Sequence, residues 1–121
     1  MNKTYAAFTI LLAVIGISAF LIFSNADTAA GQLDTFAQCL AGKEVTMYGA
    51  DWCPHCQSEK KSFGSSFRFI SYVECPENPN QCLAAGVNSY PTWIFPDGKK
   101  LEGEQGIRRL SQESGCLLPE S

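Results

Sequence analysis

The feature that most constrains this chain is a pair of cysteines, Cys53 and Cys56, that follows directly after a short apolar run. The run, residues 44–50, contains β-branched and aromatic residues and predicts a buried strand. Pro54 is suited to the first turn of a helix, so the pair lies where a strand passes into a helix. Backbone N–H groups without partners and the helix dipole stabilise a thiolate at such a position.

This placement gives the two sulfur atoms different expected roles. Cys53 is expected to be the exposed nucleophile, and Cys56, one helical turn later, the shielded partner that resolves a mixed disulfide. His55 can add positive charge beside the thiolate, or it can be an ordinary exposed histidine. Trp52 is expected to contribute to packing and to the surface that faces a substrate.

Two other interpretations of the pair stay open at this point. A zinc site would need two further ligands, and Cys75 and Cys82 are the plausible donors, although their spacing is long for a zinc knuckle. A purely structural disulfide between Cys53 and Cys56 would close so small a ring that it would constrain little.

The N-terminal part of the chain is not available to a globular core. Residues 6–23 are almost entirely apolar, and no charged residue occurs from position 4 to position 26. A helix of this stretch would be roughly 30 Å long, enough to cross the hydrocarbon core of a bilayer. We expect residues 1–24 to be a membrane anchor, or alternatively a cleaved signal peptide, and residues 25–31 to be a linker.

The charges on either side of this stretch predict its orientation. Lys3 precedes it, whereas Asp27 and Asp34 follow it and no Lys or Arg occurs before Lys43. This bias predicts a cytoplasmic N-terminus and an extracytoplasmic or periplasmic C-terminal domain. The chain would then be a single-pass cell-membrane protein, or a secreted one if the N-terminal segment is cleaved.

Export changes the interpretation of the other four cysteines. Six cysteines in about 90 exported residues indicate a disulfide framework, because that compartment is oxidising. Cys75 and Cys82 bracket a short polar loop, while Cys39 lies on the first expected helix and Cys116 at the end of the last one. We favour the pairs 75–82 and 39–116 as structural disulfides, with a second redox relay at Cys75 and Cys82 as the alternative. The net charge of −3 argues against a nucleic-acid partner.

The remaining patterns predict an alternation of helices and strands. The expected elements are a helix at 33–42, strands at 44–50 and 69–74, helices at 54–64 and 81–85, strands at 92–95 and 100–102, and a final helix from 107 to 115. This order predicts a single α/β domain, residues 32–121, with a parallel strand pair and an antiparallel edge.

Several stretches carry a resemblance to a known family. They are MYGADWCPHCQSEKKSFG (47–64), YVEC (72–75), SYPTW (89–93) and SGC (114–116). Residues 33–116 resemble a thioredoxin-fold domain and, more narrowly, the thioredoxin-like domain attached to bacterial homologues of vitamin K epoxide reductase. The resemblance implies an α/β thioredoxin-like fold, a small central sheet flanked by helices.

The resemblance also implies an activity and its site. Pro91 would be a cis proline lying against the cysteine pair, and the backbone of Tyr90 would pair with a bound substrate strand. The dipeptide Pro54-His55 resembles that of periplasmic disulfide oxidases. The implied function is therefore a thiol–disulfide oxidoreductase that exchanges the Cys53–Cys56 disulfide with client protein thiols and needs no metal or further cofactor.

The direction of electron flow and the partner stay open. An oxidase would be recycled by a quinone-linked membrane partner resembling the vitamin K epoxide reductase homologues, whose multi-helix domain we expect a separate protein to supply. The alternatives are a reductase or isomerase fed by a membrane reductant, and a non-catalytic zinc-binding or adaptor module.

One departure from the family pattern concerns the proton of Cys56. Many thioredoxins keep a buried aspartate where this chain has Met47. Asp51 and Glu59 are near in sequence, but we expect both to be solvated. The proton acceptor would then be water or a group that the fold brings in from elsewhere.

Overall fold

The computed structural model describes residues 9–18 and 31–120. The chain divides into two units, Met1–Gly31 and Gln32–Ser121. In the first, residues 9–18 are helical and carry exposed aliphatic side chains. None of the helices in these described ranges has both the length and the apolar character to cross a bilayer. The rest of the predicted anchor, and the predicted linker up to residue 30, lie outside the described residues.

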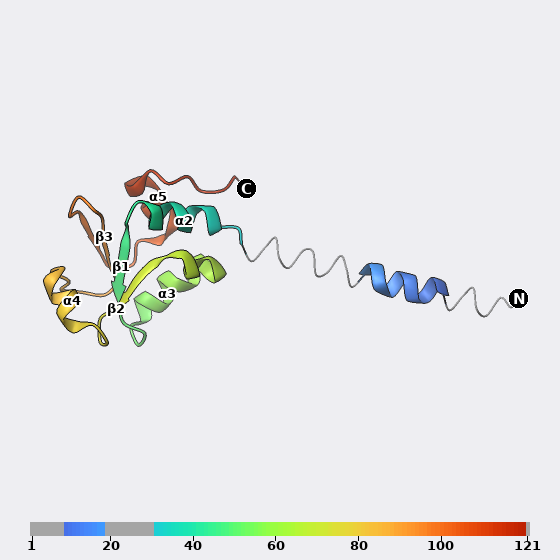
Figure 1. Cartoon of the computed structure of the whole chain (residues 1–121), viewed down its shortest axis with the longest axis horizontal. Helices are drawn as coiled ribbons and strands as arrows, with labels where there is room; N and C mark the ends of the chain where they lie inside the picture. The colour runs from blue at the N-terminus through green and yellow to red at the C-terminus, as the bar shows by residue number, and fades with distance from the viewer. Residues whose placement is uncertain (1–8, 19–30, 121) are drawn as a thin grey trace, which may run out of the picture. The chain divides into compact units, whose positions relative to one another are not determined.

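The second unit is built on a four-stranded sheet with the order β2-β1-β3-β4 (Figure 1). β1 (Thr46–Gly49) pairs in parallel with β2 (Ser71–Glu74). β3 (Thr92–Ile94) runs antiparallel to β1 and to β4 (Lys100–Glu102). The parallel pair with an antiparallel edge is the arrangement predicted from the sequence.

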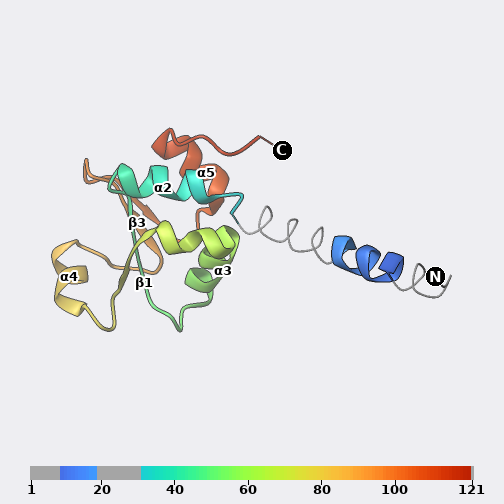
Figure 2. The same ribbon diagram turned by 45° about the vertical axis from the view of Figure 1, so that its right-hand side comes forward.

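The helices alternate with the strands along the chain. They are α2 (Asp34–Gly42) before β1, α3 (Pro54–Phe63) between β1 and β2, α4 (Pro79–Ala84) between β2 and β3, and α5 (Gly106–Ser114) after β4. Figures 1 and 2 show α2, α3 and α5 on one side of the sheet and α4 on the other. This order and strand arrangement confirm the predicted α/β thioredoxin-like fold.

The core lies between the sheet and the three helices on the same side. Met47 of β1 pairs in register with Trp93 of β3, and both side chains are fully buried. Phe63, near the end of α3, stacks on Phe36 of α2 with the ring centroids 5.9 Å apart and lies 6.0 Å from Trp93. Burying each such side chain contributes about 1.5–3 kcal/mol. This packing anchors the C-terminal end of α3 and so fixes the direction in which its N-terminal end presents the cysteine pair.

The segment after α3 differs from the sequence prediction, which ran the helix to residue 64 and began a strand at residue 69. Instead, a 3-10 turn, η1 (Gly64–Phe69), precedes β2. Gly64 has a φ of 55°, which ends the α-helix at a backbone conformation that favours glycine. Asp34 of α2 accepts hydrogen bonds from Ser66 and Arg68, and these tertiary contacts hold the turn against α2.

Two disulfides close the domain, in the pairing that the sequence analysis favours. Cys39 of α2 is bonded to Cys116 after α5, with a sequence separation of 77 residues. Cys75, after β2, is bonded to Cys82 of α4, with a separation of 7 residues. The remaining two cysteines are thiols, and both lie at the N-terminal end of α3.

Candidate active site

Cys53 is the N-cap residue of α3, at the point where the chain leaves β1. Its backbone is extended, and its N–H donates to the carbonyl of Ala50 over 3.1 Å. Pro54 then occupies the first turn of the helix, as predicted. The Cys53 sulfur accepts the backbone N–H of Cys56 at 3.3 Å, so the thiol takes the place of a capping hydroxyl or carboxylate.

The prediction that Cys53 is exposed is wrong, because the residue is almost completely buried. Its exposed fraction is only 6%, while Cys56 is fully buried. The burial arises because the loop before β3 lies against the pair: the carbonyl of Tyr90 is 3.7 Å from the Cys53 sulfur. The order of accessibility is nevertheless the predicted one, since only Cys53 retains some contact with solvent.

Burial also separates the two sulfurs chemically. Desolvation raises the pKa of Cys56 to about 12, and its hydrogen bond with Cys53 acts in the same direction. A backbone hydrogen bond with Ala50 and the charge of Lys60 offset part of this rise. Cys56 is therefore a thiol at neutral pH, and it must give up a proton before it can attack a disulfide.

The peptide bond between Tyr90 and Pro91 is cis, in line with what the family resemblance implies. The carbonyl of Pro91 accepts the N–H of Gly103 at 2.7 Å, which ties this loop to the segment after β4. Trp52 is 69% exposed and meets the Tyr90 ring edge-on, with 6.0 Å between the centroids. Its ring is thus a surface feature beside the cysteines rather than part of the core.

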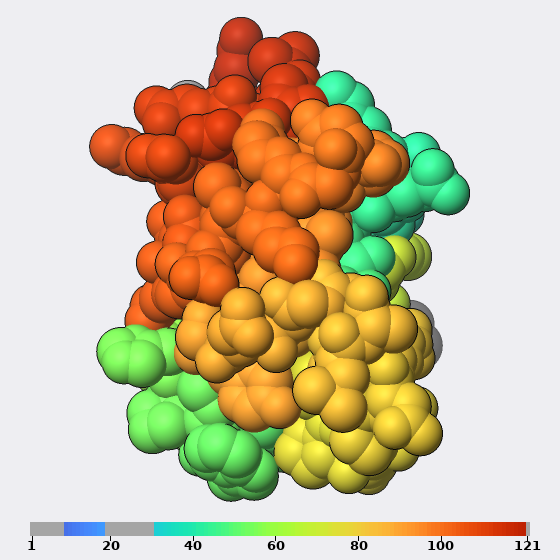
Figure 3. All heavy atoms as spheres, turned by 90° about the vertical axis from the view of Figure 1, so that its left-hand side faces the viewer, coloured from blue at the N-terminus to red at the C-terminus, as the bar shows by residue number. Residues whose placement is uncertain are grey.

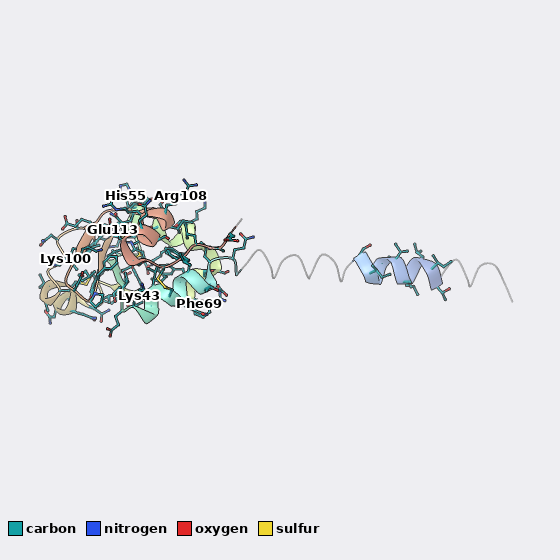
Figure 4. All side chains as sticks on the ribbon, turned by 90° about the horizontal axis from the view of Figure 1, so that it is seen from above. Lys43, His55, Phe69, Lys100, Arg108 and Glu113 are labelled. Atoms are coloured by element: carbon teal, nitrogen blue, oxygen red, sulfur yellow. A yellow bond between two sulfur atoms is a disulfide. The ribbon has the colours of Figure 1, made fainter. Side chains whose placement is uncertain are left out.

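His55 makes a contact that the sequence gave no reason to expect. Its Nδ1 lies 3.2 Å from a carboxylate oxygen of Glu104, and the other oxygen of Glu104 accepts the hydroxyl of Ser58. These partners hold the pKa of Glu104 below its ordinary value. Figure 4 shows His55 at the surface of the domain, and 72% of its side chain is exposed.

A pocket of 460 Å³ opens beside this pair of side chains. Its lining consists of His55, Gly103, Glu104, Gln105 and Gly106. The space-filling view shows the green segment that leads into α3 next to the orange segments between α4 and α5 (Figure 3). The segment after β4 is therefore part of the site, although no motif in it drew attention to residues 103–106.

The prediction that Glu59 is solvated is wrong, whereas Asp51 is exposed as expected. The Glu59 carboxylate is fully buried and accepts the backbone N–H groups of Gln105 at 2.6 Å and Gly106 at 2.9 Å. Burial raises the pKa of Glu59. Its spacing of three residues from Cys56 on one helix face was the signal that could have indicated a buried position.

The arrangement argues against the zinc interpretation. The two further ligands that it required, Cys75 and Cys82, are bonded to each other. In the part of the chain that the structure describes, no three His, Cys, Asp or Glu side chains come together to hold a metal ion.

Comparisons by sequence and by structure both find similar proteins. Over 84 residues the chain is 36% identical to Thiol-disulfide oxidoreductase LTO1 of Arabidopsis thaliana, a match that covers 62% of this chain and 22% of that protein. The chain thus spans less than a quarter of the relative's length. No protein-family model matches it.

Among solved structures, the oxidised thioredoxin of Plasmodium falciparum is 18% identical with a TM-score of 0.46, covering 66% of this chain and 86% of the thioredoxin. Oxidised glutaredoxin 2 of Chlamydomonas reinhardtii is 21% identical with a TM-score of 0.40, covering 73% and 97%. At these scores the fold assignment rests on the strand order and helix placement described above.

Proposed function

We propose that the chain is a thiol–disulfide oxidoreductase that exchanges the Cys53–Cys56 disulfide with the thiols of client proteins. The observation that carries the proposal is the geometry of Cys53, a helix N-cap whose sulfur accepts a backbone N–H and faces the carbonyl of Tyr90. The sequence similarity to a protein named as a thiol-disulfide oxidoreductase supports the same activity.

The exchange proceeds in two steps that involve only sulfur atoms and protons. A client thiolate attacks the Cys53 sulfur of the oxidised pair, the Cys53–Cys56 bond breaks, and Cys56 leaves with both bonding electrons and takes up a proton. A second client thiolate then attacks the client sulfur of the mixed disulfide and releases Cys53 as a thiolate. The client gains a disulfide and the pair gains two electrons, so no further cofactor is required.

The client segment would lie across Tyr90 and Pro91, beside the exposed ring of Trp52. The backbone of Tyr90 faces Cys53, where an extended client strand would bring its own cysteine to the nucleophile. The pocket next to His55 would receive the neighbouring part of that strand.

The cellular setting is a further part of the proposal. We place the domain outside the cytoplasm, held by the N-terminal segment as a membrane anchor, and recycled as an oxidase by a quinone-linked membrane protein. The apolar N-terminal stretch and two disulfides in a domain of this size support an oxidising compartment. A C-terminal alkaline phosphatase fusion should be active, and a silent fusion would reject this topology.

Cysteine variants of the full chain test the activity itself. Cys56→Ser retains the nucleophile without its resolver, so mixed disulfides with client proteins should accumulate on non-reducing gels. Cys53→Ser leaves a fully buried thiol, and few adducts should form. Adducts that appear with Cys53→Ser instead of Cys56→Ser would refute the assigned roles.

The reduction potential tests the direction of electron flow. A value near about −120 mV in glutathione buffers would favour the oxidase, and one near about −270 mV would favour a reductase.

A further inference from the structure

The resolving sulfur has no carboxylate at the sequence position where thioredoxins keep one. Met47 occupies that position and is fully buried. Cys56 still has to exchange a proton in every catalytic cycle, because burial keeps it in the thiol form. The acceptor is either water or another group of this chain that lies near the sulfur.

Tyr72 of β2 is such a group, and Gly49 is the residue that lets it approach. A Cβ atom on Gly49 would lie 2.9 Å from the Cys56 sulfur and 3.4 Å from the Tyr72 hydroxyl oxygen. The sulfur and the hydroxyl oxygen thus lie near the same point, separated by no more than the sum of the two distances, and a proton would cross this gap rather than follow a direct hydrogen bond. Any side chain at position 49 would separate them or clash with the sulfur.

The hydroxyl of Tyr72 in turn donates a hydrogen bond to Glu74 on the same strand. The second oxygen of Glu74 accepts the backbone N–H of Asp51 at 3.0 Å, which orients the carboxylate. Glu74 is only half-buried. The line from Cys56 through Tyr72 to Glu74 therefore leads from a fully buried sulfur to a carboxylate in contact with solvent.

We propose that Tyr72 and Glu74 form the proton path of Cys56 and replace the carboxylate that is absent at position 47. This inference rests on the proposed oxidoreductase function and assigns the residues that serve its second sulfur.

The step balances in both directions. When Cys56 resolves a mixed disulfide, its proton passes to the Tyr72 oxygen while the Tyr72 proton passes to the Glu74 carboxylate. The thiolate attacks Cys53, the Cys53–Cys56 bond forms, and the client sulfur leaves as a thiolate. When the pair oxidises a client, Cys56 leaves as a thiolate and the same protons move in the opposite direction.

The charges around the path fit this use. Lys60 of α3 lies 3.9 Å above the Tyr72 ring and 2.6 Å from the Asp51 carboxylate, and its charge favours a thiolate at Cys56. Burial raises the pKa of Tyr72, and Glu74, Asp51 and Cys56 act in the same direction. Tyr72 therefore stays protonated at rest and acts as a conduit for a proton rather than as an anion. Cys53 is the remaining titratable neighbour, and its charge disfavours a thiolate at Cys56.

The test separates the two sulfurs in a single-turnover reaction of the reduced full chain with a chromogenic aromatic disulfide. The first equivalent of coloured thiol reports the attack by Cys53, and the second reports the attack by Cys56. Tyr72→Phe and Glu74→Gln should leave the first phase unchanged and slow the second on the order of 10²-fold, the usual contribution of a positioned acid–base group. Tyr48→Phe is the matched control, because its side chain points to the opposite face of the sheet from Gly49.

The pH profile provides a readout that loosened packing would not produce. In the wild type, the second phase should depend little on pH in the alkaline range, because the proton of Cys56 has an acceptor within the protein. In both variants it should rise about tenfold per pH unit in the alkaline range, following the thiolate fraction of Cys56.

A second phase with wild-type rate and pH profile in both variants would overturn the proton path, as would equal slowing in Tyr48→Phe. A wild type with no first phase would instead reject the oxidoreductase function.

Discussion

Two regions of the domain each hold a pair of cysteines. Cys53 and Cys56 lie at the N-terminal end of α3, and the Cys39–Cys116 disulfide joins α2 to the residues after α5. The polar groups in the two regions contact different atoms. At the first, the reactive end, an N–H group and a carbonyl contact the sulfur of Cys53. At the second, the stapled end, the hydroxyl of Ser111 bonds the carbonyl of Cys116, and the N–H of Cys116 bonds Ser114. Those contacts involve the backbone of Cys116, and neither of them is to a sulfur atom.

If Cys56 has the proposed redox role and Cys116 a structural one, burial does not distinguish the two kinds of sulfur. Cys56 and Cys116 are equally inaccessible, at 0% and 1% exposed. On the proposed roles, the difference lies in the groups that can stabilise a thiolate or carry a proton, and such groups are expected where a strand ends and a helix begins.

The largest expected effect separates the two ends by stability. Replacing Cys39 and Cys116 together with alanine should lower the free energy of unfolding by about 4 kcal/mol, because the lost bridge closes a loop of 77 residues. The matched pair Cys75 and Cys82 closes only 7 residues and should cost about 2 kcal/mol. Denaturant unfolding followed by circular dichroism measures both values.

Exchange rates complete that experiment. Either double variant should exchange disulfides at the wild-type rate under conditions where it is folded, because neither bridge contacts Cys53. A folded variant that has lost exchange would show that the stapled end also takes part in the chemistry.

Much of the fold and the placement of the two cysteine pairs could be predicted from the sequence, because the patterns that indicate them are local. The strand-to-helix junction, the proline of the first turn and the order of elements each follow from a short stretch, as does the left-handed Gly115 that ends α5. The expected exposure of Cys53 failed because the Tyr90 loop, 37 residues away, lies against its sulfur.

The wrong prediction for Glu59 and the missed contact of Glu104 have the same physical origin. Their partners are 46 and 49 residues away along the chain, and no pattern within α3 indicates what will pack on it. A charged side chain is normally solvated, and Glu59 is an exception only because two backbone N–H groups of the segment leading into α5 meet it in the interior.

The second expected effect tests whether the reactive end and the stapled end stabilise the fold independently. Glu59 contacts elements that lead to both. The side chain is on α3, with the reactive pair, and it holds the start of α5, whose far end leads to Cys116. Glu59→Ala should destabilise the domain by about 2–3 kcal/mol at acid pH, since two buried N–H groups lose their acceptor. Unfolding measured across pH provides the check.

The pH dependence has a definite sign. The pKa of Glu59 is raised in the folded state, so its contribution is fully present below its ordinary value of 4.5 and is lost as the pH rises through the folded value. The difference in the free energy of unfolding between the wild type and Glu59→Ala should therefore become smaller as the pH rises. Glu113→Ala is the control with the opposite sign, because Lys99 holds the pKa of Glu113 below 4.5. A difference in the free energy of unfolding that grows with pH would contradict the buried position of Glu59.

The smallest expected effect concerns the charge next to the reactive sulfur. The Glu104 carboxylate lies 3.2 Å from the His55 ring, so Glu104→Gln removes a negative charge from the neighbourhood of Cys53. Loss of that negative charge favours the reduced thiolate, and the disulfide should become more oxidising by less than about 30 mV, since the pair is exposed and screened by solvent. His55→Ala should shift the potential in the opposite direction. If Glu104 acts through the imidazole, Glu104→Gln should change nothing in the His55→Ala background. An equal shift in both backgrounds, measured in glutathione buffers, would mean that the carboxylate acts on Cys53 directly and that His55 is a bystander at the reactive end.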